Sequence, residues 1–126
     1  MDVQLVLVGL GGFAGAVARW AVDGWLSERN PTAFPIGTLV VNLTGTFLLG
    51  VLFAWVIERN VLPAEVRAPL MIGFLGAYTT FSTFMLESWR LIEDGAWALA
   101  VANLAGSVVL GVVAVLGGLA VGRLLP

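Results

Sequence analysis

Long apolar runs separated by short polar stretches dominate the chain. Four of these runs predict helices, over residues 3–22, 36–57, 68–92 and 97–122. Each is as long as the ~20 residues that a helix needs to cross the hydrocarbon core of a bilayer. The runs are continuous and not alternating, which favours membrane helices over the strands of a membrane barrel. The pattern therefore predicts an all-α integral membrane protein, with one four-helix domain spanning residues 1–126.

The third run contains an unusually polar stretch from Gly73 to Phe84, in which five of twelve residues carry hydroxyls and two are glycine. Threonine and glycine weaken a helix, and hydroxyls offer the backbone alternative hydrogen bonds. Broken backbone is tolerated at membrane depth where it is buried in protein or lines a wet cavity, and such breaks often bind ions. The stretch predicts a broken third helix. Ordinary Ser/Thr hydrogen bonding between helices is the alternative interpretation.

Polar side chains also follow one face of the second and fourth runs. Thr38, Asn42 and Thr46 recur every four residues, and Asn103 and Ser107 repeat that spacing in the fourth run. An asparagine at mid-membrane is costly unless it bonds to another helix or to something in a cavity. Two interpretations of these stripes stand, contact between helices and the lining of a site.

Two charged residues lie close to these stripes. Arg19 falls near the predicted end of the first helix, where a cation either reaches the lipid headgroups or attracts an anion into a vestibule. Glu87 follows Phe81 by six residues and either lies near water or faces the same vestibule. No carboxylate lies in the middle of a run, which argues against a proton or cation relay.

Composition narrows the range of functions. Apolar residues make up 60% of the chain and charged residues 11%, against about 25% charged residues in soluble proteins. The chain has no Cys and no His, which excludes disulfides, thiolate chemistry and most zinc sites. The net charge of −2 argues against nucleic acid as a partner. No nucleophile–base pair or phosphate-binding loop is present, so no enzyme is predicted.

The arginines give no orientation signal. Four spans place both ends of the chain on one side of the membrane, with Arg59, Arg67 and Arg123 there and Arg19, Arg29 and Arg90 opposite. Because each side has three, the positive-inside rule selects no direction. Such a chain can insert both ways, and two oppositely inserted copies can pair. The glycine pairs Gly11/Gly15 and Gly118/Gly122 allow close helix approach, so we expect a homo-oligomer.

The residues at membrane depth suit small ions. Hydroxyl and amide donors, with the electropositive ring edges of Phe81 and Phe84, can coordinate an anion without neutralising it. Backbone carbonyls freed between Gly76 and Thr79 suit instead a dehydrated monovalent cation.

Three motifs resemble the CrcB/Fluc family of fluoride channels. They are Gly-Gly-x-x-Gly-Ala-x-x-Arg-Trp (11–20), Gly-Thr-Leu-x-Val-Asn-x-x-Gly-x-Phe (37–47) and Gly-Phe-Leu-Gly-x-Tyr-Thr-Thr-Phe-Ser-Thr-Phe (73–84). The resemblance covers all four spans, and the third motif is the most specific. It implies a dual-topology, antiparallel homodimer in the plasma (inner) membrane of a microbe. Each dimer would have two fluoride pores and one structural sodium ion at its centre, with no other protein partner.

The resemblance also assigns roles to residues. The pore residues would be Asn42, Phe81, Ser82, Thr83, Phe84, Asn103 and Ser107, and the vestibule residues Arg19 and Glu87. The sodium ion would be held by the backbone carbonyls of Gly76 and Thr79. The fourth run matches least well, because Asn103 stands where the family often has an aromatic residue.

The function that the resemblance implies is passive export of fluoride, driven outward by a negative-inside potential worth about 2.3 kcal/mol per charge per 100 mV. A small multidrug-resistance transporter has similar size, but it needs a carboxylate within the first helix, and the only acid before Arg19 is Asp2. A non-transporting membrane assembly subunit would use the polar stripes only to join helices and would conduct no ion.

Overall fold

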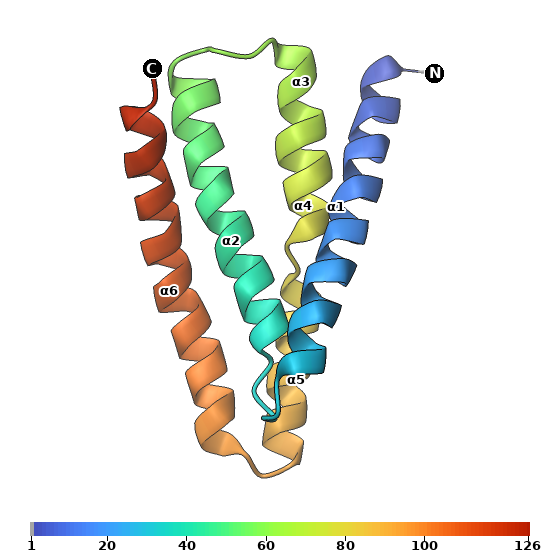
Figure 1. The fold of residues 1–126 in the computed structure, drawn as a ribbon, viewed down its shortest axis with the longest axis vertical. Helices are drawn as coiled ribbons and strands as arrows, with labels where there is room; N and C mark the ends of the chain where they lie inside the picture. The colour runs from blue at the N-terminus through green and yellow to red at the C-terminus, as the bar shows by residue number, and fades with distance from the viewer. Residues whose placement is uncertain (1) are drawn as a thin grey trace.

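Four helical spans run antiparallel in the computed structural model, which describes residues 2–126; Met1 lies outside this range (Figure 1). This described part contains no strand. Each span is long and apolar enough to cross a membrane, so the prediction of four membrane helices is confirmed. The even number of spans brings both ends of the chain to the same end of the bundle.

The spans are built from eight helical elements, two of which are π-helical. In chain order these are α1 (Val3–Arg29), α2 (Ile36–Leu52), η1 (Phe53–Glu58), α3 (Ala64–Ala68), η2 (Pro69–Leu75), α4 (Gly76–Tyr78), α5 (Phe81–Glu93) and α6 (Trp97–Leu124). The second span joins α2 to η1, and the third joins α3, η2, α4 and α5. Pro69 has no N–H to donate, and the wider π-helical turns follow directly from it.

The first helix runs seven residues beyond the predicted end at residue 22, to Arg29. The sequence places the polar residues of this extension in a loop between the first two predicted helices. In the structure they form pairs along α1 instead. The Ser27 hydroxyl donates to Asp23 Oδ1 at 3.2 Å, and Arg29 Nη1 donates to the Trp25 carbonyl at 2.9 Å. The Arg29 guanidinium also lies 4.3 Å from the centre of the Trp25 ring. These pairs join residues four apart on α1, and they stabilise the helix beyond the end of its apolar run.

Glycines set the distance between α1 and the third span. A Cβ on Gly11 would overlap the Pro69 carbonyl oxygen, and one on Gly15 would overlap that of Phe74. The same device joins α6 to the second span, where a Cβ on Gly118 would overlap the Phe47 carbonyl and one on Gly122 would lie 2.5 Å from Val51 O. The predicted close approach at both glycine pairs is confirmed, but it joins helices of one chain, so these glycines do not support the expected homo-oligomer.

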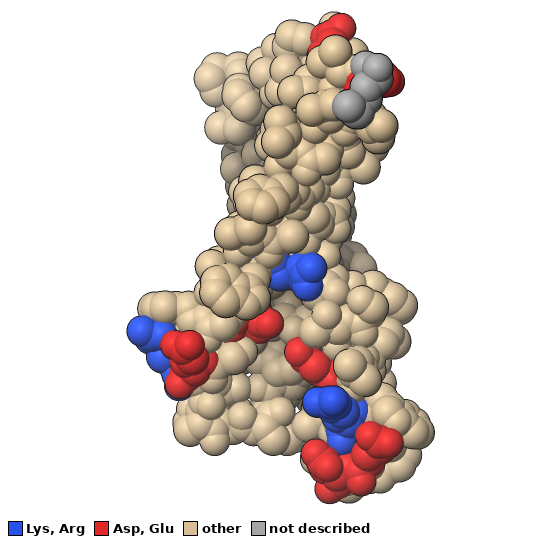
Figure 2. Space-filling view, turned by 90° about the vertical axis from the view of Figure 1, so that its right-hand side faces the viewer, with Lys and Arg blue, Asp and Glu red and all other residues tan. Residues whose placement is uncertain are grey.

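Charge is distributed unevenly over the surface. Figure 2 shows charged side chains gathered in the lower half of one face and at its upper edge, while most of the upper half is uncharged. At the upper end, Arg123 forms a two-pronged pair with Glu58, donating through Nη2 at 2.9 Å and Nε at 3.1 Å. Arg59 donates to the Leu125 carbonyl, which ties the end of α6 to η1. The composition and length of the four spans make the chain a multi-pass membrane protein.

Candidate functional site

The third span changes direction at two residues between α4 and α5. Thr79 (φ −85°, ψ 157°) and Thr80 (φ −148°, ψ 117°) have extended backbone. The Thr79 hydroxyl and N–H both donate to the Leu75 carbonyl, at 3.0 and 3.1 Å, and so complete the end of α4. The Thr80 hydroxyl accepts from the Thr83 N–H at 3.3 Å and so caps α5. Each threonine finishes one of the two helices with its own side chain.

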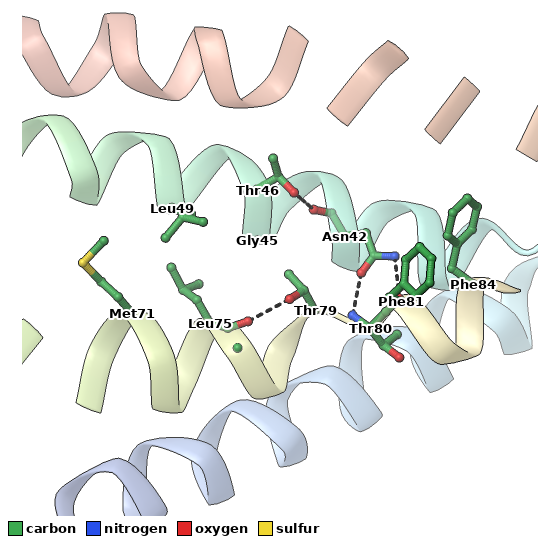
Figure 3. Close-up of a pocket in the computed structure, with 11 residues that line it drawn as sticks. Asn42, Gly45, Thr46, Leu49, Met71, Leu75, Thr79, Thr80, Phe81 and Phe84 are labelled. Carbon is green, nitrogen blue, oxygen red and sulfur yellow. Dashed lines mark hydrogen bonds between the residues drawn. The ribbon is translucent and has the colours of Figure 1, made fainter. Parts of the chain in front are cut away.

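Asn42 on α2 holds the extended backbone from the side. Its Nδ2 donates to the Thr80 carbonyl at 3.0 Å, and its Oδ1 accepts from the Thr80 N–H at 2.7 Å (Figure 3). The carboxamide therefore pairs with both the N–H and the C=O of Thr80, as a residue of a neighbouring β-strand would. Both polar groups of Thr80 are satisfied at a depth where an unpaired peptide group is costly.

A cavity of about 280 Å³ lies beside this junction, and Figure 3 shows the side chains around it. Its polar lining comes from Asn42, Thr46, Thr79 and Thr80, and its apolar lining includes Met71, Leu75, Phe81 and Phe84. No charged side chain lines it, among the residues that the structure describes. The cavity thus offers hydrogen-bonding groups and aromatic rings, but no charge that would bind an ion irreversibly.

The two phenylalanines differ in exposure. Their ring centres lie 6.1 Å apart with an interplanar angle of 68°, an edge-to-face arrangement. Phe84 is 8% exposed, whereas Phe81 is 73% exposed at the mouth of the cavity. Their contact places both rings on one side of α5. An apolar ring as exposed as Phe81 leaves one side open to a further molecule or to lipid.

Gly76 and Thr79 present unused carbonyl oxygens. The neighbouring carbonyls are occupied, Leu75 by Thr79 and Thr80 by Asn42. Within residues 2–126, no hydrogen bond reaches the carbonyls of Gly76, Tyr78 or Thr79. A Cβ built on Gly76 would meet nothing within 4 Å, so the backbone there borders open space. Free carbonyl oxygens of this kind suit a monovalent cation, and these residues fit the predicted sodium ligands. No cluster of three acidic side chains occurs in the described part of the chain.

Arg19 reaches the same junction from α1. Its side chain is half-buried, and its Nε donates to the Ala77 carbonyl in α4 at 2.9 Å. Because α1 continues for ten residues beyond it, Arg19 lies well inside the helix and not at its end. The side chain thus crosses to the third span.

Glu87 pairs with the first member of the predicted stripe. The Thr38 hydroxyl donates to Glu87 Oε1 at 2.9 Å, while Oε2 is buried with no partner among the described residues. A second hollow of about 250 Å³ opens here, between the start of α2 and the end of α5, and Arg90 and Asp94 also line it. Glu87 therefore lies at the mouth of a polar depression, and not in the wall of the cavity at the junction.

The residues predicted on α6 lie elsewhere. Asn103 is 1% exposed, donates through Nδ2 to Ser88 Oγ at 2.8 Å and accepts from the Ser107 hydroxyl at 3.3 Å. Ser88 donates onward to the Phe84 carbonyl at 2.8 Å. This chain of bonds joins α6 to the Phe84 carbonyl of α5. Neither Asn103 nor Ser107 lines the cavity at the junction.

The two hydroxyl-bearing residues between the phenylalanines, Ser82 and Thr83, have different surroundings. Thr83 accepts from the Thr80 hydroxyl at 3.0 Å, whereas Ser82 is exposed on α5 and makes no side-chain hydrogen bond within the described residues. Both lie next to the cavity in sequence, but neither is part of its lining.

Sequence reasoning missed two contributors to the junction. The Tyr78 hydroxyl lies 2.9 Å from Thr44 Oγ1, and its ring stacks on Phe74 with centres 6.0 Å apart. Tyr78 is 8% exposed, so α4 is anchored to α2 by a buried aromatic residue with a polar tip. The available signal was the single tyrosine of the chain within an apolar run. Thr44 gave none, because it lies off the predicted stripe.

Comparison with known proteins agrees with the motifs. Residues 6–119 match the family model described as CrcB-like protein, Camphor Resistance (CrcB). The chain is 46% identical to a fluoride-specific ion channel FluC of Magnetococcus marinus, over 98% of this chain and 100% of that one. It is also 46% identical to the protein of that name from Hahella chejuensis, over 97% and 96% of the two chains. The identity to the fluoride-specific ion channel FluC of Maridesulfovibrio salexigens is 43%, over 97% of each chain.

Proposed function

The chain belongs to the CrcB-like family, and from this membership we propose that it is a fluoride-specific ion channel that lets fluoride leave the cell passively. The observation that carries the proposal is the uncharged cavity at the α4–α5 junction, lined by an amide, hydroxyls and aromatic rings. Donors without a fixed positive charge compensate a dehydrated anion but still release it, as conduction requires.

The pore would run along Asn42, Phe81, Ser82, Thr83 and Phe84. Asn42 uses one of its two amide hydrogens for the Thr80 carbonyl, which leaves the other available to an anion. The ring edges of Phe81 and Phe84 add positive electrostatic potential without charge. The exposed Ser82 hydroxyl and the Thr83 side chain would continue the donor path along α5. Glu87 would lie at the vestibule, and Asn103 and Ser107 would support the pore through Ser88 and the Phe84 carbonyl.

We propose further that the working unit is an antiparallel, dual-topology homodimer in the plasma membrane of a microbe, with two pores. The balanced arginines support two-way insertion. The 73% exposure of Phe81 and the open space at Gly76 support a second copy at this face. Two pairs of free carbonyls, from Gly76 and Thr79 of each copy, would hold a sodium ion. The positive charge of that ion would attract the carbonyl oxygens of both copies and so hold the two junctions together.

The first experiment is efflux from liposomes that contain the purified protein, followed with fluoride and chloride electrodes after a potassium ionophore is added. We expect rapid loss of fluoride with chloride retained. Loss of neither ion from a protein that is still dimeric would contradict the channel function and support a non-transporting assembly subunit. Equal loss of both ions would contradict the selectivity.

The assembly has its own test. A tag on the C-terminus should be accessible from both sides of the membrane in intact and opened cells. Accessibility from one side alone would contradict dual topology, whatever the result of the efflux experiment.

A further inference from the structure

Arg19 lies one helical turn beyond the tightest contact between α1 and the third span. Gly15 packs against the Phe74 carbonyl so closely that no Cβ fits, and residues four apart on a helix share one face. The backbone of α1 is therefore fixed against η2 at this point. Arg19 extends from the same face to the end of α4, and its Nε donates to Ala77 O at 2.9 Å.

The Ala77 carbonyl needs a donor from outside its own helix. Because α4 ends at Tyr78 and the next two residues are extended, the carbonyls of its last turn have no partner from the following turn. The end of a helix also has a partial negative charge, which a cation stabilises. Arg19 supplies both a donor and a cation at a depth where water is scarce.

Ala77 lies within the stretch whose other carbonyls, those of Gly76, Tyr78 and Thr79, are free. Gly76 precedes it and Thr79 follows two residues later. Since a peptide plane is rigid, a bond that fixes the Ala77 carbonyl also limits how the preceding plane, which carries the Gly76 carbonyl, can rotate. The Thr79 carbonyl shares its plane with the Thr80 N–H, which Asn42 Oδ1 holds at 2.7 Å. Arg19 thus acts on α4 from α1, while Asn42 acts on Thr80 from α2.

We propose that Arg19 is a positioning residue of the junction: its Nε–H holds the Ala77 carbonyl, and this fixes the direction of the free Gly76 carbonyl beside it. The inference rests on the proposed channel function and gives Arg19 a task other than attracting fluoride into a vestibule. The task depends on the Nε–H donor, whereas attraction of an anion depends on the charge.

One substitution separates the donor from the charge. In glutamine, Nε2 is attached to Cδ as Nε is in arginine, so Arg19→Gln keeps an N–H donor the same number of bonds from the backbone and removes the charge. Arg19→Met has similar length but no donor. Arg19→Lys keeps the charge, with its ammonium group one bond further out. Arg29→Gln is the matched control, because it removes an arginine from the same helix away from the junction.

Two readouts are measured on the full-length protein in lipid: the rate of fluoride efflux, and amide hydrogen exchange of the peptide that covers residues 75–81. For Arg19→Gln and for the control we expect efflux within threefold of the parent rate and unchanged exchange. For Arg19→Met we expect at least tenfold slower efflux and at least tenfold faster exchange, confined to residues 75–81.

The inference is overturned if Arg19→Gln is impaired as much as Arg19→Met, because the charge is then what matters. It is also overturned if Arg19→Met leaves both readouts unchanged. Should Arg19→Met not fold, the order of the two remaining variants decides: positioning requires Arg19→Gln to exceed Arg19→Lys in efflux and in protection from exchange, and the reverse order contradicts it. Exchange does not depend on conduction, so failure of the parent to release fluoride counts against the channel function and not against the role of Arg19.

Discussion

Two asparagines lie at membrane depth in this chain, and they behave differently. Asn42 pairs with backbone groups, the N–H and C=O of Thr80, and its half-buried side chain lines the cavity at the α4–α5 junction. Asn103 pairs with two hydroxyls, those of Ser88 and Ser107, and is 1% exposed. One carboxamide stands at a surface where an ion can approach, and the other is enclosed between two helices.

The difference follows from the backbone opposite each asparagine. An unbroken helix such as α5 beyond Phe81 has used its own N–H and C=O groups, so Asn103 finds only side chains as partners. At Thr80 the helical bonds are missing, and a backbone N–H and C=O are available to Asn42. A peptide group has a fixed direction, whereas a hydroxyl rotates to suit its partner. Asn42 therefore fixes the direction of the Thr80 backbone, whereas Asn103 only satisfies the hydroxyls of Ser88 and Ser107.

The largest effect is expected from Asn42→Asp. The carboxylate would still accept from the Thr80 N–H, but it would place a second oxygen against the Thr80 carbonyl and a negative charge on an anion path. Loss of a buried donor costs ~1–3 kcal/mol, and more where charge is involved, so we expect fluoride efflux to fall about a hundredfold or more.

Asn103→Asp is the matched control for that experiment, measured by the same efflux assay with the oligomeric state compared with that of the parent by gel filtration. We expect it to lose less than tenfold, because Ser88 and Ser107 can turn their hydroxyls toward a carboxylate. A larger loss for Asn103→Asp than for Asn42→Asp would reverse the comparison.

The phenylalanines are expected to have the next largest effect. Phe81→Ile and Phe84→Ile keep apolar volume but remove the ring edges beside Asn42. Aromatic edge contacts are worth about 0.5–1.5 kcal/mol, so efflux should fall by about tenfold at each position while the protein stays folded. Normal efflux from either variant would mean that the cavity holds the anion without ring edges. Trp89→Ile, which changes an exposed ring further along α5, serves as the control.

Much of this arrangement could be predicted from the sequence, because its signals are local. Apolar run length predicts the four spans, and the glycine pairs on α1 and α6 predict the tight helix contacts. The polar stretch 73–84 marks where the third span becomes irregular, because threonine and glycine weaken a helix by their own properties.

The partners of the polar side chains could not be predicted in this way. Asn42 lies 38 residues from Thr80, and Arg19 lies 58 residues from Ala77. Such pairs depend on how the spans pack, and spacing along one helix does not contain that information. The same limit explains Asn103, whose spacing from Ser107 marks a face but not what the face meets. The end of α1 was misjudged for another reason, since its pairs at Asp23 and Trp25 are local but lie beyond the apolar boundary.

A smaller effect is expected from Asn103→Leu, which tests the enclosed side of the comparison. Two hydrogen bonds are lost, each worth about 0.5–1.5 kcal/mol, but Ser88 still donates to the Phe84 carbonyl. We expect the free energy of unfolding, measured by denaturant titration in detergent, to fall by about 1–3 kcal/mol. Efflux should fall only severalfold, because Phe84 keeps its place on α5. If efflux stopped while stability was unchanged, Asn103 would belong to the ion path.

The smallest effect is expected from Ser107→Ala, and it decides how far the ion path extends along α6. The Ser107 hydroxyl donates to Asn103 Oδ1 at 3.3 Å, a long bond from a half-buried side chain. Its loss should change stability by less than about 1 kcal/mol and leave efflux within twofold of the parent. Thr80→Val, which removes the hydroxyl that caps α5 at the junction, should reduce efflux more in the same assay. If Ser107→Ala blocked fluoride and Thr80→Val did not, the ion would pass along α6, and Asn103 would take the part assigned here to Asn42.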